Sequence, residues 1–185
     1  SGIYALEAPF VFETLRSIGC DNAQGEYYLT DVVAGARAAG RKVCALMAAD
    51  SDEIMGINDR VQLAQAALVM RSRINELHMR NGVTLVDPQA AYVDAGVETG
   101  PDTVIEPGAH LRGRTRIGSN CRIEPGVVVS DCTVGDGVHL KAGSVLEESQ
   151  VGEASAIGPM AHLRPGTILA GGNKIGNFVE TKKAV

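Results

Sequence analysis

The stretch IGPMAHLRPGTILAGGNKI, from Ile157 to Ile175, decides the fold, because an aliphatic residue returns in it at every sixth position. The same spacing extends over residues 93–185. Only two steps, from Val129 to Val134 and from Leu146 to Val151, are five residues long. The aliphatic positions of the repeat are Ile105, Leu111, Ile117, Ile123, Val129, Val134, Leu140, Leu146, Val151, Ile157, Leu163, Leu169 and Ile175.

A six-residue period matches neither an amphipathic helix nor the two-residue alternation of an ordinary strand. It predicts a parallel β-helix, in which three hexads make one triangular coil and the aliphatic side chains stack inside. The alternative, a β-sandwich of short strands, does not predict a fixed hexad. A small residue four places after the aliphatic one should fill each corner, as at Ala109, Thr115, Cys121, Ser144, Ser155, Ala161 and Thr167.

Composition excludes several classes of function. The net charge of −5 argues against a general nucleic-acid or anionic-membrane surface. No apolar run is long enough to cross a bilayer, and no signal peptide is visible. The four cysteines, Cys20, Cys44, Cys121 and Cys132, contain no C-x-x-C pair, so they predict no zinc site. We interpret them as reduced, mostly buried thiols of a cytoplasmic protein.

The first eighty residues alternate between expected strands and helices, and they look like the closing part of a doubly wound α/β domain. We expect strands over residues 3–6 and 42–47, helices over residues 9–18 and 30–40, and a solvated acidic loop over residues 50–53. A long helix should run from Arg60 to about Arg80, capped by Asn58 and Asp59. Its expected apolar stripe consists of Val61, Ala64, Leu68, Ile74 and Leu77.

The string Asn22-Ala23-Gln24-Gly25-Glu26-Tyr27-Tyr28-Leu29-Thr30-Asp31 is the first candidate site. Its polar loop and tyrosine hydroxyls, with Thr30 at a helix N-terminus, could receive a sugar or phosphate. The alternative is ordinary capping by Thr30 with packed tyrosines. In a second string, Glu53 to Arg60, Asn58 offers a neutral oxygen to Mg²⁺, although helix capping is the simpler interpretation.

The third candidate joins His162-Leu163-Arg164-Pro165-Gly166 to Glu180-Thr181-Lys182-Lys183. Arg164 and Lys182 are separated by one full turn of three hexads, so they should stand above one another. Two stacked cations without an acidic partner between them would suit a phosphate-bearing substrate. The alternative is a solvated basic edge. None of the four histidines, His78, His110, His139 and His162, forms a convincing catalytic triad.

Four of these strings in this order resemble one family over the whole chain. They are residues 24–31, 56–60, 163–166 and 176–183. The sequence resembles the bacterial bifunctional N-acetylglucosamine-1-phosphate uridyltransferase and glucosamine-1-phosphate N-acetyltransferase. Its repeat half resembles the hexapeptide-repeat transferases, and this likeness implies a left-handed coil.

The resemblance implies two reactions that together make UDP-N-acetylglucosamine. One domain transfers a uridylyl group from UTP to N-acetylglucosamine 1-phosphate with Mg²⁺. The β-helix domain first acetylates glucosamine 1-phosphate with acetyl-CoA. The product feeds peptidoglycan and, in Gram-negative bacteria, lipopolysaccharide synthesis. The family also implies a cytoplasmic homotrimer that assembles through the β-helix.

The resemblance assigns roles to five residues and none of them is a catalytic group. Asn58 matches a Mg²⁺ and UDP-sugar ligand, Tyr28 and Thr30 match the acetamido-sugar pocket, and Arg164 and Lys182 match the sugar-phosphate site. The implied domains are the end of the uridyltransferase domain over residues 1–57, a linker helix over residues 58–82, and the first part of the acetyltransferase β-helix over residues 83–185.

The chain begins without Met and ends inside the repeat register, so we expect an internal piece of a longer protein with two incomplete sites. The Gly-rich nucleotide loop and the acetyltransferase histidine of the family are not in this sequence, and the isolated chain is therefore expected to be inactive. Two alternatives stay open. One is a non-catalytic trimerising solenoid, and the other is a different sugar-1-phosphate nucleotidyltransferase with a hexapeptide tail.

Overall fold

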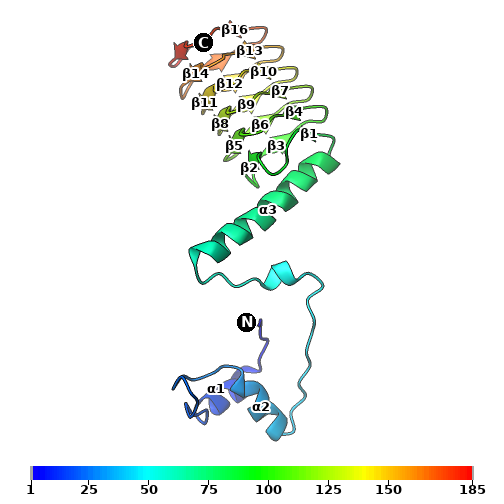
Figure 1. Cartoon of the computed structure of the whole chain (residues 1–185), viewed down its shortest axis with the longest axis vertical. Helices are drawn as coiled ribbons and strands as arrows, with labels where there is room; N and C mark the ends of the chain where they lie inside the picture. The colour runs from blue at the N-terminus through cyan, green and yellow to red at the C-terminus, as the bar shows by residue number, and fades with distance from the viewer. Residues whose placement is uncertain (1, 185) are drawn as a thin grey trace. The chain divides into compact units, whose positions relative to one another are not determined.

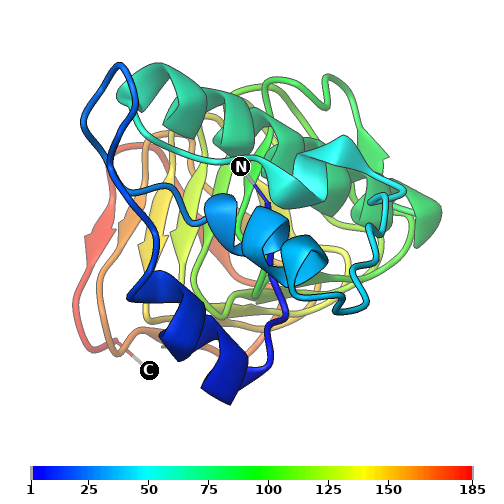
Figure 2. The same ribbon diagram turned by 90° about the horizontal axis from the view of Figure 1, so that it is seen from below.

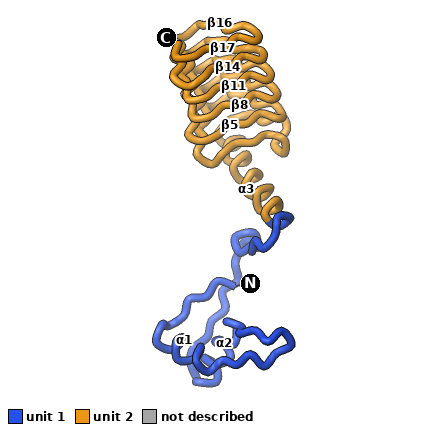
Figure 3. Tube along the Cα trace, turned by 90° about the vertical axis from the view of Figure 1, so that its left-hand side faces the viewer, with its two compact units in different colours: residues 1–62 blue, residues 63–185 orange. Residues whose placement is uncertain are grey.

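The computed structural model describes residues 2–184 and divides into two compact units. The N-terminal unit spans residues 1–62 and the β-helix unit spans residues 63–185, as the two colours of Figure 3 show. The domain boundaries expected near residues 57 and 82 stay predictions.

The β-helix unit consists of short parallel strands that follow one another in three directions per coil (Figure 1). One sheet contains β1 (Thr84–Leu85), β4 (Val104–Ile105), β7 (Arg122–Ile123), β10 (His139–Leu140), β13 (Ala156–Ile157) and β16 (Lys174–Ile175). The second contains β2 (Tyr92–Val93), β5 (His110–Arg112), β8 (Val128–Ser130), β11 (Val145–Glu147), β14 (His162–Leu163) and β17 (Glu180–Thr181). The third contains β3 (Glu98–Thr99), β6 (Arg116–Ile117), β9 (Thr133–Val134), β12 (Gln150–Val151) and β15 (Ile168–Leu169).

Each strand pairs with the strand one coil away, and every pairing is parallel. In the second sheet, for example, Leu146 lies beside Val129 on one side and Leu163 on the other. Figure 3 shows β5, β8, β11, β14 and β17 one above another, and Figure 2 shows the coils following in chain order from green to red. The predicted parallel β-helix is confirmed, and its arrangement is consistent with the left-handed sense.

The hexad positions form the core of this unit. Ile105, Leu111, Ile123, Leu140, Leu146, Ile157 and Leu163 are completely buried. Ile175 is only partly buried, because β16 is the last strand of its sheet and has a neighbour on one side only. The predicted corner residues are also buried: Ala109, Thr115, Cys121, Ser144, Ser155, Ala161 and Thr167. Burial of this continuous column is the main stabilising contribution to the unit.

Glycines at one corner let the coils approach closely. Gly100, Gly118, Gly135 and Gly152 each follow an inward residue of the third sheet. A Cβ at Gly135 would lie 2.8 Å from the backbone nitrogen of Glu153 in the next coil. Any larger side chain there would therefore push neighbouring coils apart.

Helix α3 (Arg60–Arg80) forms over the predicted residues. Asp59 caps it by accepting a hydrogen bond from the Gln62 amide at 2.8 Å, and Gln62 in turn accepts one from the Asn58 amide at 2.6 Å. This reciprocal pair resembles a capping box shifted by one residue. Asn58 therefore contributes its backbone to the cap, while Asp59 contributes its side chain.

The predicted apolar stripe of α3 is wrong except at Ile74, which is partly buried and packs against the hydrophobic core. Val61, Leu68 and Leu77 are exposed, whereas Asn75 and His78 are buried. The Asn75 amide donates to the carbonyl oxygens of Pro88 at 2.7 Å and Ala91 at 3.1 Å, so it binds the backbone that begins the first coil. A side chain that satisfies buried carbonyls is favoured here over an aliphatic one.

The N-terminal unit contains α1 (Ala8–Leu15), α2 (Asp31–Ala38) and the 3₁₀ helix η1 (Ser51–Ile54). The strands predicted over residues 3–6 and 42–47 are wrong, since the described residues there form no strand. A segment forms a strand only where a partner strand lies beside it, and the described residues supply none for these two segments. Helix α1 ends three residues earlier than predicted. The expected α/β character is thus present only as helices and loops in residues 2–62.

Two further predictions concern cysteines and membranes. Cys121 and Cys132 are buried as expected, but Cys20 and Cys44 are exposed, so the prediction that most of the thiols are buried is wrong for that pair. Both exposed cysteines lie in the N-terminal unit, where Val32 is the only buried residue of the part that the structure describes. None of the described helices is long and apolar enough to span a membrane.

Candidate functional site

Arg164 and Lys182 follow β14 and β17, which are adjacent strands of the second sheet. The pairs His162–Glu180 and Leu163–Thr181 fix the register, and the Arg164 amide donates to the Thr181 carbonyl at 3.1 Å. Arg164 and Lys182 therefore occupy equivalent positions on successive coils, which confirms the geometry expected from their spacing.

An acidic partner lies beside this pair, contrary to expectation. The Arg164 guanidinium donates to Glu180 Oε1 at 3.1 Å, and both side chains are roughly half exposed. The prediction of two cations without a carboxylate between them is therefore wrong. The reason is that Glu180 begins the strand that ends just before Lys182, and this places it diagonally above Arg164 on the same outer surface.

His162 extends this cluster on the same face. Its Nε2 lies 2.9 Å from Glu147 Oε2, on the coil below, and its Nδ1 lies 3.9 Å from Glu180 Oε1, on the coil above. Because a carboxylate only accepts hydrogen bonds, the short contact assigns a proton to Nε2. We name Glu147, His162, Arg164, Glu180 and Lys182 the sheet-edge cluster.

A similar histidine–carboxylate pair lies on the first sheet, away from this cluster. His139 Nε2 is 2.6 Å from Glu124 Oε1, and Glu124 Oε2 accepts the Ala142 amide at 2.9 Å. Burial alone would raise the pKa of Glu124, but the Ala142 amide and His139 outweigh it and lower the pKa. The carboxylate is thus fully engaged, and this pair provides an internal control for His162 and Glu147.

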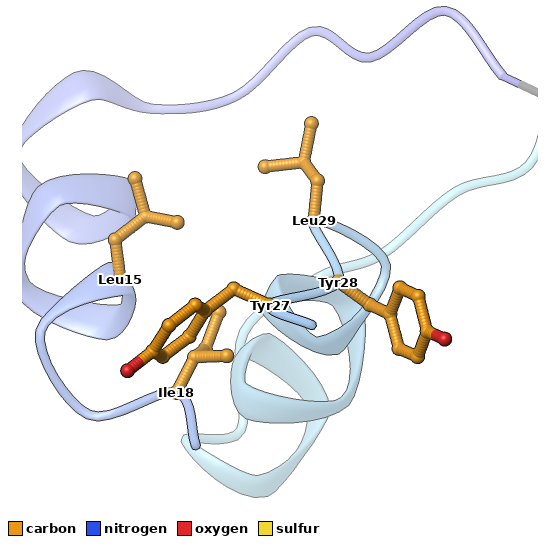
Figure 4. A pocket seen from close by; sticks show the side chains of 5 residues that line it. All are labelled: Leu15, Ile18, Tyr27, Tyr28 and Leu29. Carbon is orange, nitrogen blue, oxygen red and sulfur yellow. The ribbon is translucent and has the colours of Figure 1, made fainter. Parts of the chain in front are cut away.

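Tyr28 lines a separate pocket in the N-terminal unit. The pocket has a volume of about 400 Å³ and is lined by Leu15, Ile18, Tyr27, Tyr28 and Leu29. In Figure 4 the ring of Tyr27 lies beside Ile18, while the ring of Tyr28 points the other way. The Tyr28 hydroxyl donates to Gln24 Oε1 at 2.8 Å. The lining of this pocket is mainly apolar, and the tyrosine hydroxyls supply its polar groups.

Asn22 shapes the loop that carries Tyr28. Its side chain donates to the Glu26 carbonyl at 2.6 Å and accepts the amides of Gln24 and Glu26 at 3.1 and 3.2 Å. Gly25, with φ +66°, supplies the left-handed turn that this loop requires. These contacts explain why the predicted loop is compact.

The remaining predicted residues, Thr30 and Asn58, are exposed and are not brought together by any described contact. Thr30 precedes α2, but its side chain makes no capping hydrogen bond, so the capping prediction is wrong in that detail. Among residues 2–184 no group of three or more His, Cys, Asp or Glu side chains could hold a metal ion. Asn58 supplies one neutral oxygen, so the described residues do not form a magnesium site by themselves.

Reasoning from sequence missed Glu180 and Glu147 as partners of the predicted site. Glu180 lies sixteen residues after Arg164, and Glu147 lies fifteen residues before His162. Both separations differ from one full coil by two or three residues. A search for charges at such diagonal offsets, as well as at one full coil, would have found them.

The fold and this cluster define a hexapeptide-repeat β-helix protein with a charged sheet edge. A family described as the GMPPB C-terminal domain matches residues 92–185. The chain belongs to that family.

Several relatives match the chain from end to end. It is 57% identical to the bifunctional protein GlmU of Pelobacter propionicus and 67% identical to that of Syntrophotalea carbinolica, with all of this chain covered in both cases. The GlmU of Trichlorobacter lovleyi is also 57% identical. The chain spans about 40% of the length of each relative. The resemblance inferred from the four strings is confirmed.

One solved structure also matches, at low similarity. It is a histidine-to-asparagine mutant of perosamine N-acetyltransferase from Caulobacter crescentus in complex with CoA and GDP-perosamine. The match has a TM-score of 0.34 and 18% identity, and covers 80% of this chain and 85% of the other. A TM-score this low does not establish a common overall structure.

Proposed function

We propose that this chain is part of a bifunctional transferase that makes UDP-N-acetylglucosamine. The β-helix half would serve acetyl transfer from acetyl-CoA to glucosamine 1-phosphate. The N-terminal half would serve uridylyl transfer from UTP to N-acetylglucosamine 1-phosphate. The observation that carries the proposal is the placement of Arg164 and Lys182 on successive coils, in a chain that GlmU relatives match over its full length.

Arg164 and Lys182 bind the phosphate of glucosamine 1-phosphate in this proposal. Arginine can donate two parallel hydrogen bonds to a phosphate, and lysine adds a compact positive charge. The two residues hold the sugar by one end, which leaves its amine free to meet the acetyl donor. The amine must lose a proton in that reaction, and we assign no catalytic base among the described residues.

In the N-terminal unit, Tyr28 and Thr30 would contact the acetamido sugar and Asn58 would contact the UDP-sugar. The apolar pocket beside Tyr28 supports the first assignment, since an acetamido methyl group favours such a surface. Asn58 is further proposed as one oxygen ligand of Mg²⁺. Magnesium usually keeps several waters and substrate oxygens, so a single protein oxygen is compatible with that role. A cytoplasmic homotrimer formed through the β-helix is also part of the proposal.

The test is Arg164→Ala in a full-length enzyme that contains this chain, with both reactions assayed on one preparation. We expect kcat/KM for acetyl transfer to fall by at least about tenfold, the typical effect of losing a hydrogen bond to a charged group. Uridylyl transfer should stay close to normal. His139→Gln, which changes a histidine outside the sheet-edge cluster, serves as the control. Unchanged acetyl transfer, or equal loss of both activities together with unfolding, would contradict the phosphate-binding role.

A further inference from the structure

Helix α3 is held on the first coil of the β-helix, which contains β1, β2 and β3, mainly by polar contacts (Figure 1). The Asn75 amide binds two backbone carbonyls of the segment between β1 and β2. The Arg71 guanidinium lies 4.7 Å from the centre of the Tyr92 ring. Of the apolar stripe only Ile74 packs against the core. The helix therefore gains little stability from apolar burial, and a change in its polar contacts can release it.

Unsatisfied polar atoms lie at the same end of the unit. Among the residues that the structure describes, the buried side-chain atoms without a hydrogen-bond partner are Asn75 Oδ1 and Thr99 Oγ1. Asn75 lies on α3, and Thr99 lies on β3, the first strand of the third sheet. A buried oxygen without a donor destabilises the state that buries it by about 1–3 kcal/mol. Local opening should therefore begin at this end of the unit.

His78 lies on the buried face of α3 and is only 7% exposed. Burial lowers the pKa of its side chain, and no charged group contributes to that change. A protonated His78 would thus be a nearly buried cation without a carboxylate partner among the described residues. Such a cation favours the state in which water reaches it, and here that state is the released helix.

His110 is a second histidine connected to the same junction. Its ring stacks on the Tyr92 ring with the ring centres 4.5 Å apart, and Tyr92 in turn contacts Arg71 of α3. Burial and Arg112 lower the pKa of His110 more than Asp94 raises it. Protonation of His110 would add a cation to a cluster that already contains two arginines and one carboxylate.

We propose that α3 undocks from the first coil in mild acid, below about pH 6.5, while the other coils stay folded. His78 and His110 drive the change, because each accepts a proton more readily when the helix is released. The only bonds formed are the second N–H bonds of the two imidazole rings. Helix α3 begins at Arg60 and the N-terminal unit ends at residue 62, so this helix is the covalent connection between the two units. The histidines thus control whether that connection is held on the β-helix.

The charged residues close to His78 in the chain and at the end of the helix do not oppose this change. On α3 itself, Glu76 and Arg80 pair with each other at 2.6 Å. On the first coil, the Asp102 amide donates to the backbone carbonyl that follows the helix. None of these three groups contributes to the lowered pKa of His78. The charged imidazole therefore gains no compensating attraction while the helix stays docked.

The experiment is hydrogen exchange of this chain, measured by mass spectrometry at about pH 7.5 and pH 5.5, on either side of the ordinary histidine pKa. Exchange rates are converted to protection factors, so that the pH dependence of the chemical step cancels. Between these two pH values, the protection of residues 71–80 should fall at least about twofold more than that of residues 139–163, because only the helix is released.

Two variants test the role of the histidines. His78→Gln and His110→Gln should each reduce the extra loss of protection in α3, and the double variant should abolish it. Glutamine is neutral at both pH values, so a purely structural contribution of either histidine would lower protection equally at both. His139→Gln is the matched control, because His139 pairs with Glu124 and has no contact with α3 among the described interactions. It should retain the full loss.

Three results would overturn the inference. The first is equal protection of α3 at both pH values in the wild-type chain. The second is a loss shared equally by residues 139–163, which would show that the whole unit opens. The third is a loss that persists in the double variant. If His78→Gln releases the helix at both pH values, the wild-type profile and His110→Gln still decide. None of these results depends on binding of a sugar phosphate, so this inference and the proposed function can fail independently.

Discussion

The β-helix unit and the N-terminal unit differ in how they bury their apolar residues. In the β-helix unit one aliphatic column runs through successive coils and is sealed from solvent. In the described part of the N-terminal unit, residues 2–62, Val32 alone is buried, while Leu46 and Met47 are almost fully exposed. The difference shows that stability here comes from repetition of one packing position, and not from the amount of apolar sequence.

The largest expected difference between the two units is in the free energy of unfolding lost when one leucine of each is replaced by alanine. Leu146 is completely buried and Leu46 is 99% exposed. Leu146→Ala should lower the free energy of unfolding by about 2–5 kcal/mol, because it removes apolar contacts and leaves a cavity between coils. Leu46→Ala should change it by less than about 0.5 kcal/mol. Urea unfolding followed by circular dichroism measures both, and equal losses would show that the N-terminal unit is packed as tightly as the coils.

A glycine substitution tests the close approach of the coils. Gly135→Ala should destabilise the β-helix unit by about 1–3 kcal/mol, because the new methyl group meets the Glu153 backbone. Gly176→Ala is the control, since a Cβ there has no atom within 4 Å. Thermal unfolding midpoints compare the two variants. A midpoint for Gly135→Ala equal to that of Gly176→Ala would mean that the coils can separate without cost.

The smallest expected effect is a dependence on pH that is confined to the β-helix unit, which holds all four histidines. Burial lowers the pKa of His78. Below the ordinary histidine value of about 6.5, the unfolded chain therefore binds a proton before the folded unit does. The free energy of unfolding is therefore highest above that pH, and it declines as the pH falls below it. His110 adds an effect in the same direction, because burial and Arg112 lower its pKa more than Asp94 raises it.

Urea midpoints at about pH 7.5 and pH 5.5, on either side of the ordinary histidine pKa, measure this loss. It should be smaller in His78→Gln than in the wild-type chain. Glu76→Gln provides a control on the same helix, because it changes an exposed residue paired with Arg80 and leaves His78 in place. An identical loss in wild type and His78→Gln would show that His78 does not contribute.

The repeat was predictable because each coil determines its own side-chain directions. The hexad places Leu111 or Ile157 inside wherever it recurs, and only the terminal position Ile175 departs from that rule. The strands expected over residues 3–6 and 42–47 failed for the opposite reason, since a strand depends on a partner that local sequence does not specify. The helical period of α3 was predictable, but of its predicted apolar face only Ile74 packs against the core. Asn75 was selected by carbonyl oxygens of a later segment.

The candidate site was predictable in position but not in charge balance. The spacing of one coil brought Arg164 and Lys182 into register, as observed. The contact between Glu180 and Arg164 was not predicted, because it runs diagonally between coils and depends on side-chain length and direction. The Tyr28 pocket likewise depends on Leu15 and Ile18, which come from a separate segment of the chain.

The stacked register also constrains how such a gene can change in length. Strands β4, β7, β10 and β13 begin at residues 104, 122, 139 and 156, so a coil takes 18 or 17 residues. Deleting one coil leaves every later strand in its own sheet. Deleting a single hexad moves every later strand onto the next sheet and carries its outward-facing residues to a different side of the prism. Heritable insertions and deletions within the β-helix should therefore come in whole coils. Only such changes keep Arg164 and Lys182 at equivalent positions on successive coils.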